Sequence, residues 1–417
     1  MKENISRIET KYIKRRMASI IREAIGKFSV VAVSGARQVG KSTMLLNEFP
    51  DFAYFTLDDF DTLDMVKTDP SYIFTKHDFI IIDEAQKLPE IFGSIKLAVD
   101  KFKNKRVIIS GSSNILLMKN ITESLAGRAL YFEMQPLTYG EINGVIEPRN
   151  FFGLWNGGAE IKEGETPENP SVIPLMLRGF MPHNVTTDDN SDIALWMNGY
   201  VKTYLERDLR ELSQIDSIID FRRIMHILAL RSGNILNQSD AARDAKISGS
   251  TASRYIKLLE ISNIINLVPG FYDSKGKRVT KSPKIYFIDP ALSIFLSGYL
   301  DEESLSHSRE LGGYFETTVF FHLKCLCEML KPSAGIYYRR TTASGKEVDF
   351  ILEHGRKLLA IEVKMTQNPL VKDAANLFDF IKEYPETVSG ILLHNGRETK
   401  RLGSRVIAVP WWWIDTE

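Results

Sequence analysis

The chain has 417 residues, of which 44% are hydrophobic and 25% are charged, a composition typical of a globular protein of about three domains. Its 53 basic and 53 acidic residues leave no net charge, so any attraction to nucleic acid must come from a local basic face. The first residues lack the apolar core of a signal peptide, and no apolar run approaches the ~18 residues of a membrane span. These features predict a soluble protein that does not enter a membrane. Its two cysteines, Cys325 and Cys327, cannot form a disulfide framework, which predicts a cytoplasmic location.

Short apolar runs alternate with helical segments in the first third of the chain. A basic helix is expected over residues 11–25, before the first run. The apolar runs lie at 28–33, 52–57, 79–82, 106–110 and 129–132. Because continuous apolar runs are typical of strands buried on both faces, they predict a parallel sheet in an α/β domain. We expect this domain to cover residues 1–140.

Residues 35–42 read GARQVGKS and match the phosphate-binding pattern G-x-x-x-x-G-K-[ST]. Gly35 and Gly40 let the backbone amides turn toward a phosphate, Lys41 reaches the β- and γ-oxygens, and Ser42 joins the shell of a magnesium ion. The pattern therefore predicts a site for ATP with Mg²⁺. The other candidate nucleotide-binding residues of this segment are Arg37, Gln38, Val39 and Thr43.

The run at 79–82 ends in two carboxylates, Asp83 and Glu84. Asp83 is expected to hold magnesium together with Ser42, and Glu84 to orient and deprotonate the attacking water. The alternative is a strand that leads into an acidic, solvated turn. The long stretch between Lys41 and Asp83 suits a P-loop fold with an inserted strand. The strand at 106–110 would lie between the strand before the phosphate loop and the strand that ends at Asp83.

Two further residues are candidates for catalysis. Ser110 ends the run at 106–110 and is placed to sense the γ-phosphate or to hold the water, although it also fits a serine-rich turn. Arg128 is a candidate arginine finger, within one chain or across subunits, and fits equally well as a surface arginine.

The middle of the chain is predicted to be helical. A polar loop at 156–171 and a helix at 191–212 form a connector over 141–215. Helices within 221–233 and 238–265, followed by a hairpin, then suggest a winged helix-turn-helix over 216–300. Its polar side chains would contact DNA or RNA, or else meet water or another domain. On the second helix these side chains are Ser250, Thr251, Ser253, Arg254 and Lys257. The hairpin residues Lys275, Lys277, Arg278, Lys281 and Lys284 would extend this exposed basic face.

Several segments together resemble a widespread group of prokaryotic AAA-type ATPases that carry a restriction-endonuclease-like C-terminal domain of unknown function. The segments are GARQVGKST, FIIIDEAQKLPE, IISGSSNILLM, ESLAGRALYFEMQPLTYGE, EVDFIL and IEVK. The resemblance spans about residues 15 to 410, apart from an insert-like region at 150–172. It implies a P-loop ATPase core, a winged-helix section and a nuclease-like α/β domain over 301–417, and no settled biological role.

The C-terminal domain carries a second constellation of charged residues. Asp349 lies on one expected strand, and Glu362 and Lys364 share a face of the next, as in the D…E-x-K arrangement of restriction-type nucleases. The carboxylates would bind Mg²⁺ and Lys364 would steady the attacking hydroxide. The resemblance adds Glu316 as a further metal ligand. The alternative is a solvated strand face with a salt bridge from Lys364 to a carboxylate.

Two functions remain open. In the first, a Mg²⁺-dependent ATPase couples its nucleotide state to domain rearrangement and acts on nucleic acid. In the second, an ATP-driven switch recruits a protein partner, and the nuclease-like domain is catalytically silent. The oligomeric state and the physiological substrate are not predicted by the sequence.

Overall fold

The computed structural model describes residues 12–111, 121, 123–156, 161, 163–166, 170–187, 189–208, 215–272, 276, 278, 281–341 and 345–417. The chain divides into two compact units. Unit 1 comprises Met1–Leu137, Glu141–Ile146 and Pro182–Asp188, and unit 2 comprises Thr138–Gly140, Glu147–Met181 and Asp189–Glu417. Each unit is therefore assembled from segments that are distant in the sequence.

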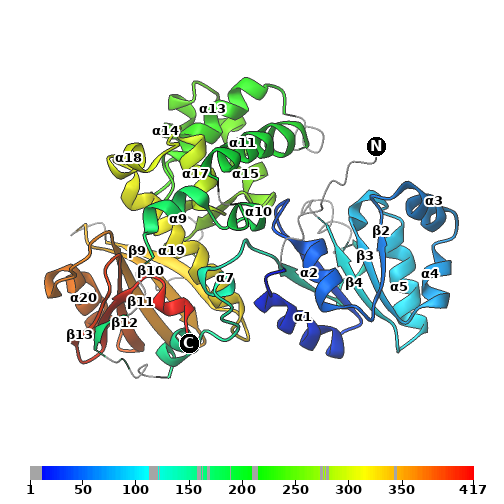
Figure 1. Cartoon of the computed structure of the whole chain (residues 1–417), viewed down its shortest axis with the longest axis horizontal. Helices are drawn as coiled ribbons and strands as arrows, with labels where there is room; N and C mark the ends of the chain where they lie inside the picture. The colour runs from blue at the N-terminus through cyan, green and yellow to red at the C-terminus, as the bar shows by residue number, and fades with distance from the viewer. Residues whose placement is uncertain are drawn as a thin grey trace, which may run out of the picture. The chain divides into compact units, whose positions relative to one another are not determined.

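In the described part of the chain, unit 1 contains a five-stranded parallel sheet (Figure 1). Its strands are β1 (Val30–Ser34), β2 (Ala53–Thr56), β3 (Phe79–Asp83), β4 (Arg106–Ser110) and β5 (Ala129–Glu133). The order across the sheet is β2-β3-β4-β1-β5. This order confirms the predicted parallel sheet and the insertion of the 106–110 strand between the phosphate-loop strand and the Asp83 strand.

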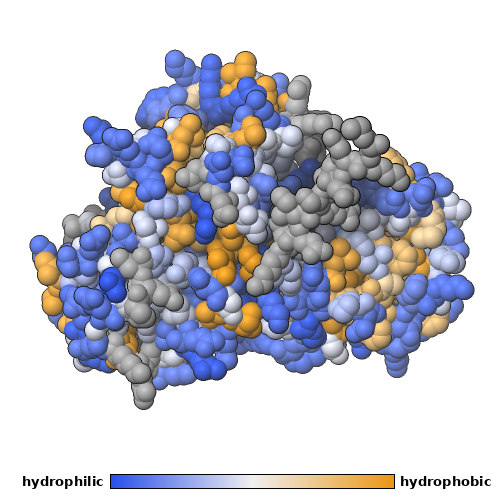
Figure 2. All heavy atoms as spheres, in the orientation of Figure 1, coloured by the Kyte–Doolittle hydropathy of each residue, from blue (hydrophilic) through white to orange (hydrophobic). Residues whose placement is uncertain are grey.

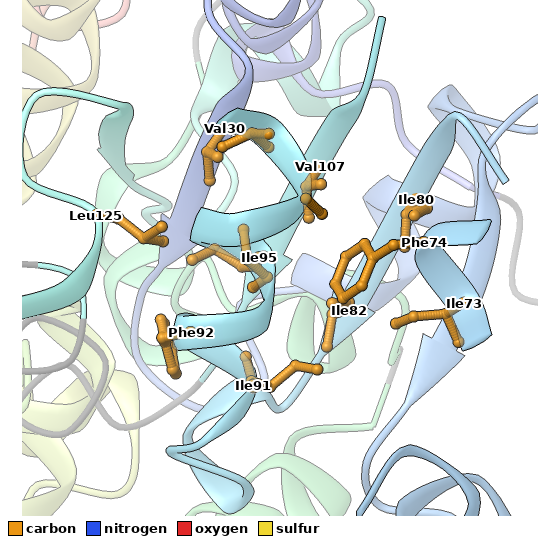
Figure 3. Close-up of a cluster of buried hydrophobic side chains, with 14 of the residues drawn as sticks. Val30, Ile73, Phe74, Ile80, Ile82, Ile91, Phe92, Ile95, Val107 and Leu125 are labelled. Atoms are coloured by element: carbon orange, nitrogen blue, oxygen red, sulfur yellow. The ribbon is translucent and has the colours of Figure 1, made fainter. Parts of the chain in front are cut away.

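The helices of unit 1 cover this sheet and supply its apolar core. Figure 3 shows Ile91, Phe92 and Ile95 of one helix packed over Val30 and Val107 of the sheet. Residues spaced by three or four positions share a helix face, which buries these side chains together. The helices are α1 (Arg16–Lys27), α2 (Lys41–Glu48), α3 (Phe60–Thr68), α4 (Ser71–Lys76), η1 (Ala85–Lys87), α5 (Ile91–Lys101) and α10 (Pro182–Val185). The residues of α7 (Tyr139–Ile142) are divided between the two units.

The first part of unit 2 is mostly helical and contains a pair of antiparallel strands, β7 (Ile265–Val268) and β8 (Lys284–Phe287). The predicted helices of this region are present, although the stretch expected at 191–212 continues from α11 as a π-helical segment, η2. The helices are α8 (Arg149–Leu154), α9 (Val172–Arg178), α11 (Asn190–Tyr200), η2 (Val201–Asp208), α13 (Ile218–Ala229), α14 (Gln238–Asp244), α15 (Gly249–Ile261), α17 (Pro290–Leu296), α18 (Glu302–Ser306) and α19 (Leu311–Glu328).

The second part of unit 2 is a mixed sheet whose described order is β6-β13-β14-β12-β11-β10-β9. Helix α20 packs on it through Leu377 and Phe380, which join Ile351 and Ala360 in one apolar cluster. The remaining elements are β6 (Gly164–Glu165), β9 (Gly335–Arg340), β10 (Glu347–His354), β11 (Lys357–Lys364), η3 (Val371–Ala374), α20 (Ala375–Glu383), β12 (Thr387–His394), β13 (Glu398–Gly403), β14 (Val406–Pro410) and η4 (Trp413–Asp415). Strand β6 lies within the predicted 156–171 loop and pairs with β13.

Hydrophilic side chains predominate on the face of the molecule shown in Figure 2. None of the helices in the described ranges combines the length and the apolar character that a membrane crossing requires.

Candidate functional sites

The phosphate loop joins the end of β1 to the start of α2. Three of its residues have positive φ angles: Gly35 at 147°, Gln38 at 68° and Gly40 at 93°. A Cβ atom on Gly35 would lie 2.3 Å from the carbonyl oxygen of Met134, so this position requires glycine. The loop ends at the amino terminus of α2, where free amides and the helix dipole favour an anion.

Lys41 lies across this loop rather than in solvent. Its side chain is 6% exposed, and Nζ donates hydrogen bonds to the carbonyl oxygens of Gly35 at 3.0 Å and Ala36 at 2.9 Å. Burial lowers the pKa of Lys41 to about 8, against the opposing effect of the nearby carboxylates of Glu84 and Asp83. A bound phosphate would favour the charged form of Lys41, because an anion next to an ammonium raises its pKa.

Asp83 accepts hydrogen bonds from three other elements of unit 1. Ser42 Oγ on α2 donates to Asp83 Oδ2 at 2.5 Å, and Ser110 Oγ on β4 donates to Oδ1 at 2.5 Å. Tyr54 on β2 donates its hydroxyl to Oδ2 at 2.6 Å. The structure thus brings together Ser42, Asp83 and Ser110, which the sequence singled out as site residues. Oxygen ligands of this kind suit Mg²⁺.

Tyr54 is a member of this site that the sequence analysis missed. Its strand pairs with β3, with Thr56 opposite Asp83, which places the tyrosine near the aspartate. Burial, followed by the hydrogen bond to Asp83, raises the pKa of Tyr54 well above its ordinary value, so the hydroxyl stays protonated and donates. A tyrosine on the strand next to Asp83 was the available sequence signal, but it does not reveal where the hydroxyl points.

The remaining predicted residues of the nucleotide site lie around the loop. Glu84 follows β3 with a φ of 53° and is half-buried, and its Oε2 accepts a hydrogen bond from Gln86 Nε2. Arg37 and Thr43 are exposed, and the charge of Arg37 contributes to lowering the pKa of Lys41. Val39 is buried, and its carbonyl oxygen faces Arg15.

Arg15 anchors the phosphate loop and was also missed. Its side chain is 7% exposed, and Nη1 donates to the carbonyl oxygen of Val39 at 2.8 Å. Nη2 donates to the carbonyl oxygens of Gln135 at 2.5 Å and Pro136 at 3.0 Å, and Nε lies 3.4 Å from Glu141 Oε1. In the sequence, Arg15 is one of several basic residues of a segment expected to be a basic helix, and nothing marks it as buried.

Arg128 is not brought to the phosphate loop of its own chain. It precedes Ala129, which pairs with Val30 at the amino end of the parallel strands, whereas the loop follows their carboxyl end. Its guanidinium contacts Asp100 through Nε at 2.7 Å and Nη2 at 3.0 Å. The alternative of a surface arginine fits this position, and a role across subunits stays a prediction.

Unit 2 holds a second cluster of charged side chains, which we call the carboxylate cluster: Glu316 on α19, Glu347 and Asp349 on β10, and Glu362 on β11. Lys364 Nζ lies 2.7 Å from Glu362 Oε1, as expected for neighbours on one strand face. Asp349 lies where the pairing of β10 with β9 shifts register, and its Oδ2 accepts a hydrogen bond from the amide of Val363 at 2.8 Å. The structure therefore brings together the predicted residues Asp349, Glu362, Lys364 and Glu316.

An ammonium group from elsewhere in the chain enters this cluster. Lys284 Nζ lies 2.9 Å from Glu316 Oε1, 2.5 Å from Glu347 Oε1 and 3.5 Å from Asp349 Oδ1, and the residue is 3% exposed. The prediction that Lys284 extends an exposed basic face is therefore wrong. Its burial could not be read from the sequence, because a lysine in a basic hairpin resembles a solvated one.

Burial shapes the protonation of the cluster. It raises the pKa of Glu316 to about 7 and that of Glu362 to about 8, and in both cases the charge of Asp349 adds to the effect. Among the residues that the structure describes, no three His, Cys, Asp or Glu side chains are placed to hold a metal ion. The predicted metal ligands Asp349, Glu362 and Glu316 instead face ammonium groups, so this arrangement does not fit Mg²⁺.

The predicted nucleic-acid face is only partly exposed. The guanidinium of Arg278 contacts Glu353 at 2.6 Å and lies 4.4 Å from the ring centroid of Phe271. The expectation of a fully exposed Arg278 is therefore wrong. On α15, Arg254 is exposed and forms an ion pair with Asp216. Lys275 and Lys277 lie outside the described residues. The other predicted residues on exposed positions are Ser250, Ser253, Lys257 and Lys281, and Thr251 is half-buried.

Three family models match separate parts of the chain. Residues 27–143 match an AAA domain, and residues 170–303 and 311–414 match two domains of unknown function, DUF8612 and DUF4143. The matched AAA domain contains β1 to β5, the phosphate loop and Asp83.

Similar proteins include curated relatives and a solved structure. The uncharacterized protein Rv2008c of Mycobacterium tuberculosis is 29% identical over 411 residues, which are 97% of this chain and 85% of that protein. The uncharacterized protein MJ1544 of Methanocaldococcus jannaschii is 25% identical over 88% of this chain and 80% of its own length. The Walker-type ATPase PABY2304 of Pyrococcus abyssi matches with a TM-score of 0.47 and 16% identity, over 70% of this chain and 98% of that one.

The AAA family match coincides with the five-stranded sheet, the glycine-dependent loop and the lysine that lies across it. Residues 27–143 are therefore similar to an AAA domain and carry a P-loop on a parallel sheet.

Proposed function

We propose that unit 1 binds MgATP and hydrolyses it, and that the nucleotide state changes the arrangement of the domains. The observation that carries this proposal is the convergence of Ser42, Ser110 and Tyr54 on the carboxylate of Asp83 at 2.5 to 2.6 Å, beside the loop that Lys41 crosses. A hydroxyl and a strand-end carboxylate next to a phosphate loop are the groups that hold the magnesium ion for phosphoryl transfer in P-loop proteins.

Each residue has a distinct part in the proposal. The loop amides and Lys41 bind the triphosphate, and Ser42 and Asp83 hold the magnesium ion, which would neutralise charge on the phosphate oxygens. Glu84 orients the attacking water and accepts its proton. Ser110 acts through Asp83, because its hydroxyl donates to that carboxylate and fixes its orientation.

The test is ATP turnover measured with Mg²⁺, in the presence and absence of DNA and RNA. Lys41→Ala should abolish nucleotide binding, and Glu84→Gln should bind ATP with near-normal affinity but hydrolyse it slowly, by about 100-fold or more. Lys103→Ala, which changes an exposed lysine of the same unit, is the matched control. Unchanged ATP affinity in Lys41→Ala would remove the phosphate-loop assignment, and near-normal turnover in Glu84→Gln would remove Glu84 from its role as base.

The remaining regions are proposed to have separate roles. We infer a helical connector over 141–215, a winged-helix section over 216–300 and a restriction-endonuclease-like domain over 301–417. The order α13, α14, α15, β7 and β8 supports the winged helix, and the carboxylate cluster on α19, β10 and β11 supports the nuclease-like domain. Salt-dependent binding of DNA or RNA, weakened by Lys257→Ala, would support a nucleic-acid role for α15.

Of the two functions considered, the ammonium of Lys284 within the carboxylate cluster favours the ATP-driven switch with a silent nuclease-like domain. Metal-dependent cleavage requires carboxylates that are free to bind a divalent ion. A Mg²⁺- or Mn²⁺-dependent cleavage activity that Asp349→Ala abolishes would favour the nuclease instead.

A further inference from the structure

We propose that the ammonium group of Lys284 is the resident cation of the carboxylate cluster and that it excludes a divalent metal ion from Glu316, Asp349 and Glu362. This inference deepens the proposed silence of the nuclease-like domain and is independent of ATP hydrolysis in unit 1.

The position of Lys284 is the first argument. Its Nζ is within 3.5 Å of carboxylates from two elements, at 2.9 Å from Glu316 on α19 and at 2.5 Å and 3.5 Å from Glu347 and Asp349 on β10. A divalent ion bound by these side chains would need their oxygens at about 2.0 to 2.6 Å from a common centre. Because the ammonium contacts the same oxygens, the ion and the lysine cannot occupy the cluster together.

The balance of charge is the second argument. Four carboxylates lie in the cluster, and Lys284 and Lys364 supply the buried or half-buried ammonium groups that contact them. Glu362 is only 2% exposed, and within the described residues its Oε2 atom has no hydrogen-bond partner. A buried carboxyl oxygen without a partner is costly and is satisfied by a proton or by a cation, so the cluster retains capacity for a cation. Removing Lys284 would increase that capacity.

The backbone around Lys284 holds the ammonium in this place. Tyr338 donates its hydroxyl to the carbonyl oxygen of Ser282 at 2.5 Å, and the amide of Ile285 donates to the carbonyl oxygen of Asn234 at 3.0 Å. Tyr286, two residues along the same strand, donates its hydroxyl to Glu316 Oε1 at 2.5 Å. Strand β8 therefore presents both Lys284 and Tyr286 to the cluster, and a residue of the 170–303 match neutralises carboxylates of the 311–414 match.

The experiment measures Mn²⁺ binding by calorimetric titration of the full chain without nucleotide. The variants are Lys284→Met, Lys284→Gln and the double variant Lys284→Met with Glu362→Gln, and Lys281→Met is the control at an exposed lysine. We expect Lys284→Met and Lys284→Gln to gain a saturable Mn²⁺ site, about tenfold or more tighter than any binding by the parent. The double variant should lose this site, and Lys281→Met should behave as the parent.

Three outcomes would overturn the proposal. The first is equal Mn²⁺ affinity in the parent and in Lys284→Met, weakened in both by Glu362→Gln, because the lysine would then exclude nothing. The second is a folded Lys284→Met protein that gains no Mn²⁺ site. The third is the failure of both lysine variants to fold even with Mn²⁺ present, because the proposal requires the ion to replace the ammonium.

Thermal unfolding separates these cases, since a metal bound to the folded state alone raises the unfolding temperature. A Mn²⁺-dependent rise is expected in Lys284→Met and not in the double variant. ATP turnover of the same proteins is read separately, so a failure of the proposed ATPase activity leaves the Mn²⁺ result unaffected.

Discussion

Tyr54 donates a hydrogen bond at 2.6 Å to Asp83 Oδ2, the same oxygen that accepts from Ser42 at 2.5 Å. Ser42 would also coordinate a magnesium ion through its hydroxyl oxygen, whereas the Tyr54 hydroxyl donates its proton to this carboxylate oxygen. Tyr54 is therefore a positioning residue for the carboxylate, acting through Asp83 rather than on the nucleotide.

Tyr54→Phe should raise the Mg²⁺ concentration that ATP hydrolysis requires. The substitution keeps the ring and removes a hydrogen bond to a charged group, which contributes about 1.5 to 3 kcal/mol. We expect the Mg²⁺ concentration for half-maximal ATPase activity to rise by about tenfold, with the affinity for metal-free ATP little changed. Tyr72→Phe, at a position 44% exposed, is the control. An unaltered Mg²⁺ dependence in Tyr54→Phe would show that Ser42 and Ser110 suffice to orient Asp83.

Arg15→Gln should loosen the phosphate loop. The change removes the buried guanidinium that contacts the Glu141 carboxylate and the carbonyl oxygens of Val39 and Gln135, and breaking a buried ion pair costs about 3 to 5 kcal/mol. We expect a lower urea midpoint for unfolding and weaker ATP binding. Arg22→Gln, which removes an exposed ion pair with Glu48, should leave both nearly unchanged. Equal effects of the two substitutions would contradict an anchoring role for Arg15.

The loop itself could be predicted from the sequence because its requirements are local. Gly35, Gly40 and Lys41 are specified by the turn and by the phosphate, and the run before them reads as a buried strand. Arg15 and Tyr54 could not be found in this way. Their roles depend on contacts with residues up to 126 positions away, as for Arg15 with Glu141, and their residue types are ordinary in a basic helix and a strand.

The affinity for MgATP should fall above about pH 8. Burial lowers the pKa of Lys41 to about 8 in the empty site, and bound phosphates would raise it. Below pH 8 the ammonium is charged before and after binding, so the affinity is constant. Above pH 8 binding must take up a proton, so the affinity falls by up to about tenfold per pH unit. Calorimetry at pH 8.5 in two buffers of different ionisation enthalpy would reveal this uptake. Identical heats in both buffers would contradict it.

The unfolding free energy of unit 2 should decrease as the pH rises from about 4.5 to 8. The pKa of Glu316 is raised to about 7 and that of Glu362 to about 8, so the folded state binds more protons than the unfolded state in this window. Each carboxyl contributes a slope of up to about 1.4 kcal/mol per pH unit. The loss is complete once the pH exceeds both folded-state values.

Glu362→Gln tests this expectation, because glutamine cannot titrate. Its unfolding free energy, measured in urea between pH 5.5 and 8, should depend less steeply on pH than that of the parent. Burial lowers the pKa of His394 to about 4, so between this pKa and the ordinary pKa of histidine His394 makes the unfolding free energy rise with pH. This contribution is the same in the parent and in Glu362→Gln. Parallel pH profiles would mean that Glu362 stays ionised in the folded protein.

The carboxylate cluster shows where prediction from the sequence ended. The alternation of side chains along a strand predicted that Glu362 and Lys364 share a face, and in the structure Lys364 Nζ donates a hydrogen bond to Glu362 Oε1. Asp349 lies at a register shift between Val348 and Ile351, which strand periodicity does not reveal. Lys284 reaches Asp349 from 65 positions away, and only the packing of β8 against α19 and β10 identifies it as buried.

The path of the chain has a consequence for dissecting this protein. The loop carbonyl of Val39 is held by Arg15, and a Cβ on Gly40 would lie 3.5 Å from Pro182 Cγ. Both partners fall outside the matched stretch 27–143. An excised fragment with those ends would therefore lack the guanidinium behind the loop and the proline beside it. A minimal ATPase fragment has to retain residues 12–26 and include the segment 182–187, which contains α10.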